Sequence, residues 1–305
     1  MLDIALVGTG GMLPLPNRNL SSMMARLNGS MLLIDCGEGT QCSLRTLGWG
    51  YKNIDIICFT HFHADHISGL PGLLLTMGAS RTEPVVMIGP SGLAHIVDSL
   101  CVIAREIPFD IDFIELPFES GAIEIKLPKT DYIIHALPVD HRCPCFAYSI
   151  QVERPGKFDQ SRARALDLPV QFWSRLQKGE TIEYNNSIFT PGMVLGTPRR
   201  GIKISYCTDS RPKKTLADFI CGSDLFICEG LHGDEERFDK VRKAKHMMYS
   251  EAAALAKAGD VSKLWLTHFS PALIDPRQYL QSARNIFPNT YAGYDRMTET
   301  IAFSE

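Results

Sequence analysis

Four side chains of metal-ligand type fall within six consecutive positions of this chain, directly after a short apolar run. They are His61, His63, Asp65 and His66. The run at 54–59 predicts a buried strand, and residues two apart on an extended chain point to the same side, so His61 and His63 can converge on one ion. Gly69 and Pro71 break any continuation of the strand and predict a turn. That turn would bring the other two side chains toward a second ion beside the first.

The chemistry of these four side chains favours a metal centre. Imidazole and carboxylate together suit zinc or a similar divalent ion. Two such ions about 3.5–4 Å apart can hold the attacking and the leaving oxygen of a hydrolysis. The alternative is a polar turn with chance histidines, but histidine is an uncommon residue. The cluster therefore predicts a two-metal hydrolytic centre.

Composition limits the other possibilities. The chain has 305 residues, 45% of them hydrophobic, which is enough to bury a sizeable core. The formal charge of −3 is close to neutral, so a nucleic-acid-binding surface would have to be local. Nine cysteines without a Cys-x-x-Cys pair favour reduced thiols in a cytoplasmic protein, and we interpret Cys143 and Cys145 as small buried thiols. Because no basic leader and no apolar run of about 20 residues occurs, we expect neither secretion nor a membrane span.

Strands and helices are predicted to alternate along most of the chain, which indicates an α/β fold. Apolar runs bounded by turn residues predict strands at 4–7, 31–39, 54–60 and 85–90, within 111–137, and at 202–207, 225–229 and 263–268. Helices are predicted at 40–47, at 91–104 and after Ser250. Ser250 is the expected N-cap of that last helix and Gly259 its expected C′ residue.

The segment at about 153–200 differs in character from the rest. It is rich in Arg, Lys, Gln, Asn, Pro and Gly, and contains one short amphipathic stretch at 172–178. We interpret it as an arm that leaves the core rather than as a second domain. The predicted organisation is therefore a single domain, 1–305, with an inserted arm.

Further polar residues stand where predicted strands stop. They are His141, Asp209, Glu229 and His268. Functional groups tend to gather at strand ends, where a rigid sheet holds them. For any one of these residues alone, a capping or solvated role would explain the position equally well. Together with the cluster at 61–66, they predict one shared site.

These residues, in this order, resemble the metallo-β-lactamase fold and, within it, the short form of ribonuclease Z, the family of tRNA 3′-processing endonucleases. The narrower resemblance rests on the Gly-Leu-Pro-Gly-Leu run at 69–73, the Thr-His-Phe-Ser-Pro run at 267–271, and the segment 154–158, which is similar to the start of the family's substrate arm. It implies an αββα sandwich of two mixed sheets flanked by helices.

The resemblance also implies a ligand set and a reaction. One zinc ion would be held by His61, His63 and His141, and the other by Asp65, His66 and His268, with Asp209 bridging both. Manganese or another divalent metal could replace zinc. A metal-bridging hydroxide, oriented by Asp65, would attack a phosphodiester and remove the 3′ trailer of a tRNA precursor. His246 and Glu229 match the family's residues that assist the leaving group.

Substrate contacts and assembly are implied in the same way. The expected substrate-binding residues are Arg18, Asn19, Arg154, Lys157 and Arg211. The expected partner is a tRNA precursor, and the expected assembly is a cytoplasmic homodimer in which the arm of one subunit serves the site of the other. Basic residues at 211–214 and 237–245 flank Asp209 and His246, which favours RNA because phosphate contacts dominate nucleic-acid affinity.

The sequence departs from the family pattern in several places. Glu229 and His246 keep their identity, but the family residues beside them are replaced, so His246 could instead be a solvated residue that ends a basic run. Pro16 stands where the family has a basic residue, and 168–173 replaces the Gly-Pro element of the arm. The first alternative function is therefore a phosphodiesterase of the same fold that acts on small or cyclic nucleotides. A binding protein with a vestigial site is the second, but burying unused charged ligands would be costly.

Overall fold

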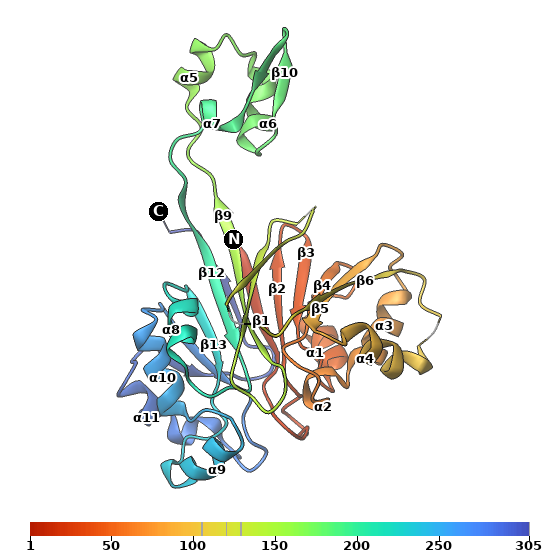
Figure 1. The fold of residues 1–305 in the computed structure, drawn as a ribbon, viewed down its shortest axis with the longest axis vertical. Coiled ribbons are helices and arrows are strands. Elements are labelled where there is room, and N and C mark those ends of the chain that lie inside the picture. The colour runs from red at the N-terminus through yellow and green to blue at the C-terminus, as the bar shows by residue number, and fades with distance from the viewer. Residues whose placement is uncertain (105, 120, 129, 305) are drawn as a thin grey trace. The chain divides into compact units, whose positions relative to one another are not determined.

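The computed structural model describes residues 1–104, 106–119, 121–128 and 130–304. Two seven-stranded sheets form its centre, with helices along their outer sides (Figure 1). Both sheets are mixed, because each combines antiparallel and parallel neighbours. The predicted αββα sandwich of the metallo-β-lactamase fold is thereby confirmed.

The first sheet contains most of the N-terminal half. Its order is β16 (Thr298–Ile301), β1 (Leu2–Gly8), β2 (Ser22–Leu27), β3 (Ser30–Ile34), β4 (Ile54–Cys58), β5 (Val85–Pro90) and β6 (Ile111–Leu116). The strands from β3 to β6 run parallel, with crossover helices between them, whereas β16, β1, β2 and β3 pair antiparallel. The C-terminal ends of β3 and β4 therefore meet at one edge.

The second sheet repeats this plan with the later strands. Its order is β15 (Thr290–Ala292), β14 (Leu264–Thr267), β13 (Leu225–Glu229), β12 (Arg199–Cys207), β9 (Phe146–Arg154), β8 (Ile133–Pro138) and β7 (Ile123–Lys126). The strands β12, β13, β14 and β15 are parallel neighbours. Their apolar residues alternate little because both faces of the sheet are covered, as parallel sheets require.

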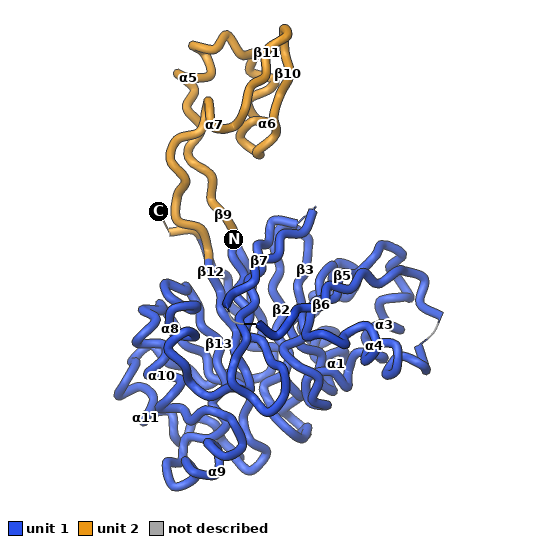
Figure 2. The backbone as a smooth tube through the Cα atoms, in the orientation of Figure 1, with its two compact units in different colours: residues 1–151, 203–302 blue, residues 152–202, 303–305 orange. Residues whose placement is uncertain are grey.

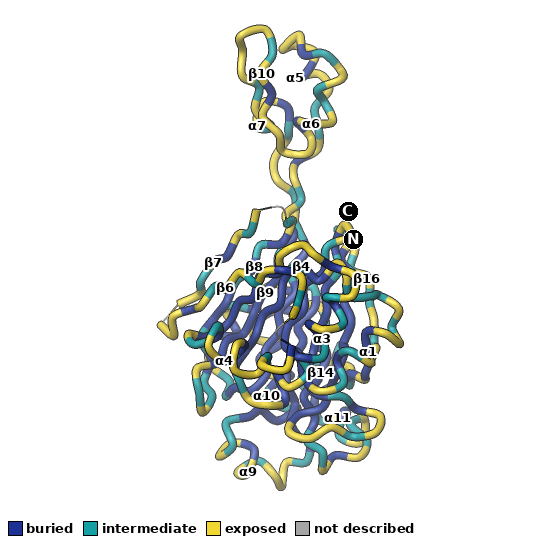
Figure 3. Tube along the Cα trace, turned by 90° about the vertical axis from the view of Figure 1, so that its right-hand side faces the viewer, coloured by how far each residue is buried: buried dark blue, intermediate teal, exposed yellow. Residues whose placement is uncertain are grey.

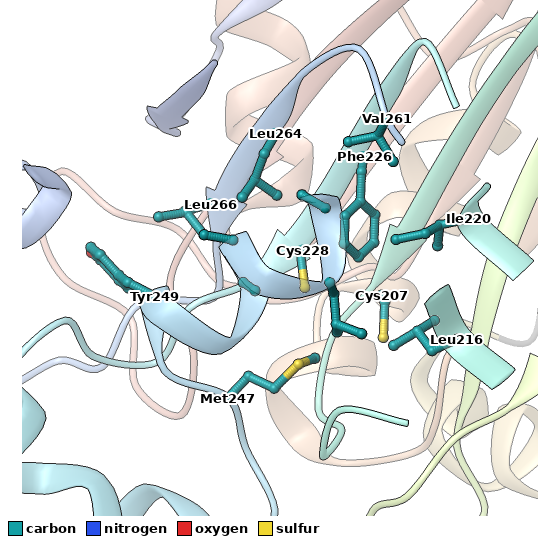
Figure 4. Packing of buried hydrophobic residues seen from close by; sticks show 14 of the residues in the cluster. Cys207, Leu216, Ile220, Phe226, Cys228, Met247, Tyr249, Val261, Leu264 and Leu266 are labelled. Atoms are coloured by element: carbon teal, nitrogen blue, oxygen red, sulfur yellow. The ribbon is translucent and has the colours of Figure 1, made fainter. Parts of the chain in front are cut away.

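Helices cover the outer side of each sheet (Figure 1). Beside the first sheet are α1 (Thr40–Leu47), α2 (Ala64–Ile67), α3 (Leu70–Gly78) and α4 (Leu93–Leu100); beside the second are α8 (Lys214–Ile220), α9 (Phe238–Lys243), α10 (Tyr249–Ala258) and α11 (Leu280–Arg284). Figure 4 shows how Leu264 and Leu266 of β14 pack with Phe226 of β13 and Ile220 of α8. Figure 3 shows that burial is concentrated in the strands, so the sheets form the rigid frame.

The chain divides into two compact units, coloured separately in Figure 2. The first comprises 1–151 and 203–302, and the second comprises 152–202 and 303–305. The second unit contains α5 (Gln160–Ala165), α6 (Trp173–Gln177), β10 (Ile182–Tyr184), β11 (Ser187–Phe189) and α7 (Pro191–Val194). It buries a small core of its own: Ala163, Leu168, Leu176, Ile182 and Val194. This is the segment interpreted from sequence as an arm.

One helix boundary differs from the prediction. The helix α10 begins at Tyr249, and Met248 is its N-cap, so Ser250 lies inside the first turn. The Met248 amide donates to Glu251 Oε2 at 3.0 Å, which satisfies one of the otherwise unpaired groups at the helix start. The C-cap Gly259 has φ −84°, so the expected left-handed termination is absent there.

Two expectations from composition can be compared with the structure. All nine cysteines carry free thiols. Among the described residues, none of the helices combines the length and the apolar character needed to cross a bilayer.

Candidate metal centre

Parallel pairing brings three of the predicted residues to one edge of the second sheet. Asp209 lies just after β12, Glu229 ends β13, and His268 follows β14. The register pairs Cys207 with Cys228, and Glu229 with Thr267, so these strand ends are level with one another. The sheet thus places a carboxylate, a second carboxylate and an imidazole side by side.

The cluster at 61–66 reaches the same place from the first sheet. The strand β4 ends at Cys58, and His63 is the N-cap of the one-turn helix α2. This short helix is the predicted turn, and it points Asp65 and His66 inward, where both side chains are buried. His141 arrives in the loop after β8.

The ligand-type atoms form two groups. In the first, His63 Nδ1 lies 2.9 Å from His61 Nε2 and 3.4 Å from His141 Nε2. In the second, His268 Nε2 lies 3.2 Å from His66 Nε2 and 3.3 Å from Asp65 Oδ2. Both groups qualify as places where a metal ion could be held. The side chains brought together here are the two ligand sets that the family resemblance implied.

Asp209 stands between the two triads with one oxygen toward each. Its Oδ2 is 3.6 Å from the Nε2 atoms of both His61 and His141. Its Oδ1 is 3.3 Å from His66 Nε2 and 3.1 Å from His268 Nε2. A carboxylate in this orientation can bind one ion through each oxygen.

The side chains present fit divalent metal ions. Among the described residues, the buried Asp209 Oδ1 and His268 Nδ1 have no hydrogen-bond partner, although imidazole nitrogens lie close to that oxygen. Leaving a buried carboxylate oxygen without a partner is costly, and a cation would remove the cost. Three neutral imidazoles and one carboxylate in one group, and two imidazoles and two carboxylates in the other, match the nitrogen and oxygen donors of zinc.

The pKa shifts agree with this interpretation. Burial lowers the pKa of His61, His63 and His141, which keeps their imidazoles in the unprotonated form that binds a metal. Burial also opposes protonation of His66, but Asp209 and Asp35 outweigh it and raise the pKa of that imidazole. The carboxylates therefore favour a positive charge at this position, whether a proton or a metal ion supplies it.

Asp35 and Thr60 fix the orientation of two imidazoles from behind. Asp35 Oδ2 is 2.8 Å from His66 Nδ1, and Asp35 Oδ1 accepts a hydrogen bond of 2.8 Å from the Thr60 amide. The Thr60 hydroxyl donates to the same carboxylate and lies 3.1 Å from His61 Nδ1. Such outer partners set the tautomer of a ligating histidine and the direction of its ring.

Several of these residues hold a backbone conformation that side chains rarely adopt. The φ angles of Asp35, Asp209 and His268 are 59°, 48° and 56°, all in the left-handed region. Asp and His tolerate this region better than most residues, but for both it carries a cost that the surrounding structure must offset. The sharp turns that result aim each side chain back across its strand end.

Behind the triads, His246 and Glu229 form a buried pair. His246 Nδ1 lies 2.8 Å from Glu229 Oε2, and it also lies 3.8 Å from Asp209 Oδ2. Burial lowers the pKa of His246, but the charge and the hydrogen bond of Glu229 outweigh it and raise that pKa to about 9. The other Glu229 oxygen accepts from the Ser210 amide at 2.6 Å. His246 is therefore an oriented imidazole rather than a solvated residue at the end of a basic run.

Two of the expected substrate-binding residues have internal roles instead. Arg18 is buried, and its guanidinium donates to the carbonyl oxygens of Ser270 and Ile274 at 3.2 and 3.0 Å. Arg211 forms a bidentate ion pair with Glu251, in which Nη1 lies 2.9 Å from Oε2. The same guanidinium also donates to the His246 carbonyl oxygen. These guanidinium groups are already paired within the protein, and their part in substrate binding stays a prediction.

The remaining expected substrate contacts are placed differently. Asn19 lies in the loop between β1 and β2. Its backbone N–H donates to Asp295 Oδ2 at 2.6 Å, and its side-chain amide donates to the Ser43 hydroxyl. Arg154 and Lys157 belong to the second unit. Lys157 is exposed there and lines a cleft together with other basic and aromatic side chains, among them Phe158, Trp173, Lys178 and Arg199.

Sequence analysis missed the residues that support the centre from outside. Asp35 and Thr60 lie where predicted apolar runs stop, and only their side-chain contacts reveal their roles. Cys143 and Cys145 lie beside the centre: their sulfurs are 3.8 Å from His63 Nε2 and 3.7 Å from His61 Nδ1. Cys145 is buried, as the sequence suggested, whereas Cys143 is partly exposed.

Comparisons with known proteins agree with this geometry. A model of the family described as anti-Pycsar protein Apyc1 matches residues 2–101. Ribonuclease Z of Clostridium kluyveri is 54% identical over 307 residues, covering 100% of both chains, and that of Lachnoclostridium phytofermentans is 52% identical over 306 residues, covering 100% of this chain and 99% of its own. Among solved structures, the short form of human tRNase Z is similar in fold, with a TM-score of 0.71, 23% identity, and coverage of 99% of this chain and 100% of that chain.

The role assigned to Asp35 can be tested by replacing it with its neutral isostere. Asp35→Asn keeps the shape, and Asn is tolerated at positive φ, but the charged acceptor behind His66 is lost. We expect the affinity for one divalent ion per chain to fall about 10–100-fold, measured by competition with a coloured chelator. Asp295→Asn is the matched control, because Asp295 is similarly buried but bonds Thr9 and Asn19 rather than a histidine. Equal metal affinity in the two variants would contradict the assignment.

Proposed function

The chain belongs to the ribonuclease Z family of metal-dependent endoribonucleases, and from this premise we propose that it removes the 3′ trailer of tRNA precursors. The reaction is supported by relatives named ribonuclease Z, which share 52% and 54% sequence identity with this chain over its whole length. The observation that carries the hydrolytic part is the Asp209 carboxylate, which offers one oxygen to each of two ligand triads. This arrangement suits two ions that act on a single phosphodiester.

We propose two zinc ions per chain as the native metals. His61, His63 and His141 would hold one, and Asp65, His66 and His268 the other, with Asp209 shared. When bound, zinc brings the pKa of a coordinated water to about 7 and so supplies the nucleophile at neutral pH. Manganese or another divalent ion remains compatible with the same nitrogen and oxygen donors.

Asp65 would orient the attacking water or hydroxide through its carboxylate. The Met12 amide donates to Asp65 Oδ2 at 2.6 Å, which fixes the carboxylate. Burial raises the pKa of Asp65, but the hydrogen bond from His268 and the charge of His66 outweigh it and hold that pKa well below its usual range. The carboxylate therefore stays ionised and able to accept a hydrogen bond.

His246 would donate a proton to the leaving oxygen. A pKa of about 9 keeps its imidazole protonated at neutral pH, and Glu229 fixes the ring through Nδ1, which leaves Nε2 as the donor. The ring stacks on His268 with centroids 5.4 Å apart, so it stands directly beside the second triad. Proton donation at this point would release the 3′-hydroxyl end of the tRNA.

Substrate recognition would extend into the second unit. Its cleft combines aromatic faces, Phe158 and Trp173, with the basic side chains of Lys157, Lys178 and Arg199. Aromatic and basic groups together bind nucleic acid through stacking and phosphate contacts. We propose that this unit, including Arg154 and Lys157, grips the tRNA precursor, that Asn19 contributes near the cut, and that the enzyme works as a cytoplasmic homodimer. The free thiols support the cytoplasmic location, and the family resemblance supports the homodimer.

The proposed reaction can be tested by mapping the cut. With zinc present, the purified protein should cleave a 3′-extended tRNA precursor once, after the discriminator nucleotide, and leave a 3′-hydroxyl on the tRNA. His63→Ala should lose metal and nearly all activity, because His63 Nδ1 is central to the first triad. An intact precursor after incubation with the metal-loaded protein would refute the proposal.

His246→Ala tests the proton donor. A positioned acid typically contributes about 10²–10⁴-fold, so kcat should fall by that order while the metal content stays unchanged. Glu229→Gln should behave similarly, since it removes the charge that orients the imidazole. The control is His232→Ala: His232 is equally buried but packs against Tyr279, and its loss should leave kcat unchanged. Unaltered turnover in His246→Ala would remove this residue from the reaction.

Removing the second unit distinguishes the two enzyme functions. The chain enters and leaves it at adjacent points, because the Gly196 amide donates to the Lys157 carbonyl at 2.9 Å, so two glycines can replace 157–196. Hydrolysis of a small phosphodiester should be almost unchanged. Binding of precursor tRNA should weaken, and the slope of log K against log salt should drop by roughly 0.9 per lost phosphate contact on duplex. If tRNA binding and its salt slope stay the same, a small or cyclic nucleotide becomes the preferred substrate.

A further inference from the structure

A basic groove lies on the first unit next to the candidate metal centre. It has a volume of about 540 Å³ and is lined by Asp140, Arg211, Asp239, Arg242, Lys243 and Lys245. Four of the six lining side chains are cationic, on a chain whose formal net charge is −3. The groove is therefore locally positive, although the net charge of the whole chain is negative.

The backbone ties this groove directly to the reacting residues. Asp140 immediately precedes His141, and Lys245 immediately precedes His246. His141 Nδ1 lies 3.3 Å from the Lys245 carbonyl oxygen, so the two segments touch at the boundary between groove and centre. Asp140 also pairs with Arg211 through a backbone hydrogen bond of 3.0 Å. The groove therefore adjoins the candidate metal centre, since two of its lining residues directly precede His141 and His246 in the chain.

The cations of the groove fall into two kinds. Lys245 is paired with Asp140 at 3.0 and 3.1 Å, and Arg211 is paired with Glu251. Arg242 and Lys243 are exposed on α9, and no described residue forms an ion pair or a hydrogen bond with the side chain of either of them. Lys245 and Arg211, which we call the floor of the groove, are thus neutralised within the protein. Arg242 and Lys243, which we call its rim, carry positive charges that have no partner among the described residues.

The rim is held rigidly enough to present these charges. Val241, between Lys240 and Arg242 on α9, is buried in a small cluster with Leu231 and Met248. Arg142 donates to the Lys243 carbonyl at 3.2 Å and fixes the end of the helix.

We propose that this groove binds consecutive phosphates of the RNA strand next to the scissile phosphodiester, through the side chains of Arg242 and Lys243. The inference rests on the proposed function, because it needs an RNA whose cut bond sits at the metals. Arginine and lysine bind phosphate oxygens through charge-assisted hydrogen bonds, and each contact displaces counterions from the RNA. The paired floor keeps Lys245 and Arg211 in place as the strand passes over them.

The test reverses both unpaired charges. We expect Arg242→Glu/Lys243→Glu to weaken binding of a 3′-extended tRNA precursor about ten-fold or more, and to lower the slope of log K against log salt by roughly 1.4–1.8, for two phosphates. Hydrolysis of a small aryl phosphodiester should stay within about two-fold of the wild type, since the triads and His246 are untouched.

A matched control keeps the change in net charge the same. Arg45→Glu/Lys52→Glu also replaces one exposed arginine and one exposed lysine of the first unit, but on the side of α1, away from α9 (Figure 1). It should leave the salt slope at the wild-type value. Asp239→Asn gives the opposite sign: it removes a negative charge from the groove and should tighten RNA binding.

The outcomes separate this inference from the proposed function. If the wild type cuts the precursor but the groove variant binds it with the affinity and salt slope of the control, the groove is not a phosphate track and the function stands. If the wild type neither binds nor cuts the precursor, both fall. A reduced slope in the groove variant alone, with small-substrate hydrolysis preserved, establishes the groove.

Discussion

The candidate centre depends on one buried carboxylate. Asp209 is 2% exposed, and imidazoles from three segments of the chain, those of His61, His66, His141 and His268, approach its two oxygens. Burial alone would raise its pKa, but His268 and the other imidazoles outweigh that effect and hold the pKa well below its usual range. An ionised carboxylate in this environment needs compensating positive charge, and the proposed metal ions would supply it. The two triads are arranged around this carboxylate.

The fold provides the positions that this carboxylate requires. Parallel strands of the second sheet bring Asp209, Glu229 and His268 to the same edge, and β4 delivers the cluster at 61–66 from the other sheet. Left-handed backbone at Asp209 and His268 turns their side chains back over the strand ends. Such strain persists only where the surrounding structure over-determines it, and here the buried strands do so.

Chemistry and recognition are divided between separate parts of the chain. The triads, His246 and Glu229 all belong to the first unit, whereas the second unit has its own core and a cleft with aromatic and basic side chains. The basic groove at α9 belongs to the first unit and adjoins the reacting residues. Under the proposed function, a small phosphodiester would need only the first unit, while a long RNA would use contacts beyond it.

The sequence by itself predicted a metal centre built from ligand-type residues at the ends of apolar runs, because strand periodicity and turn residues are local signals. The division of these residues into two triads was implied by the family resemblance. Local signals do not show which atoms meet across the fold. The bridging orientation of Asp209, the support of His66 by Asp35 and the Met248 cap came only from the tertiary structure. So did the internal pairing of Arg18, whose acceptor Ile274 is 256 residues away, and of Arg211 with Glu251. A charged side chain looks the same in sequence whether it faces solvent or a partner, and packing alone decides which.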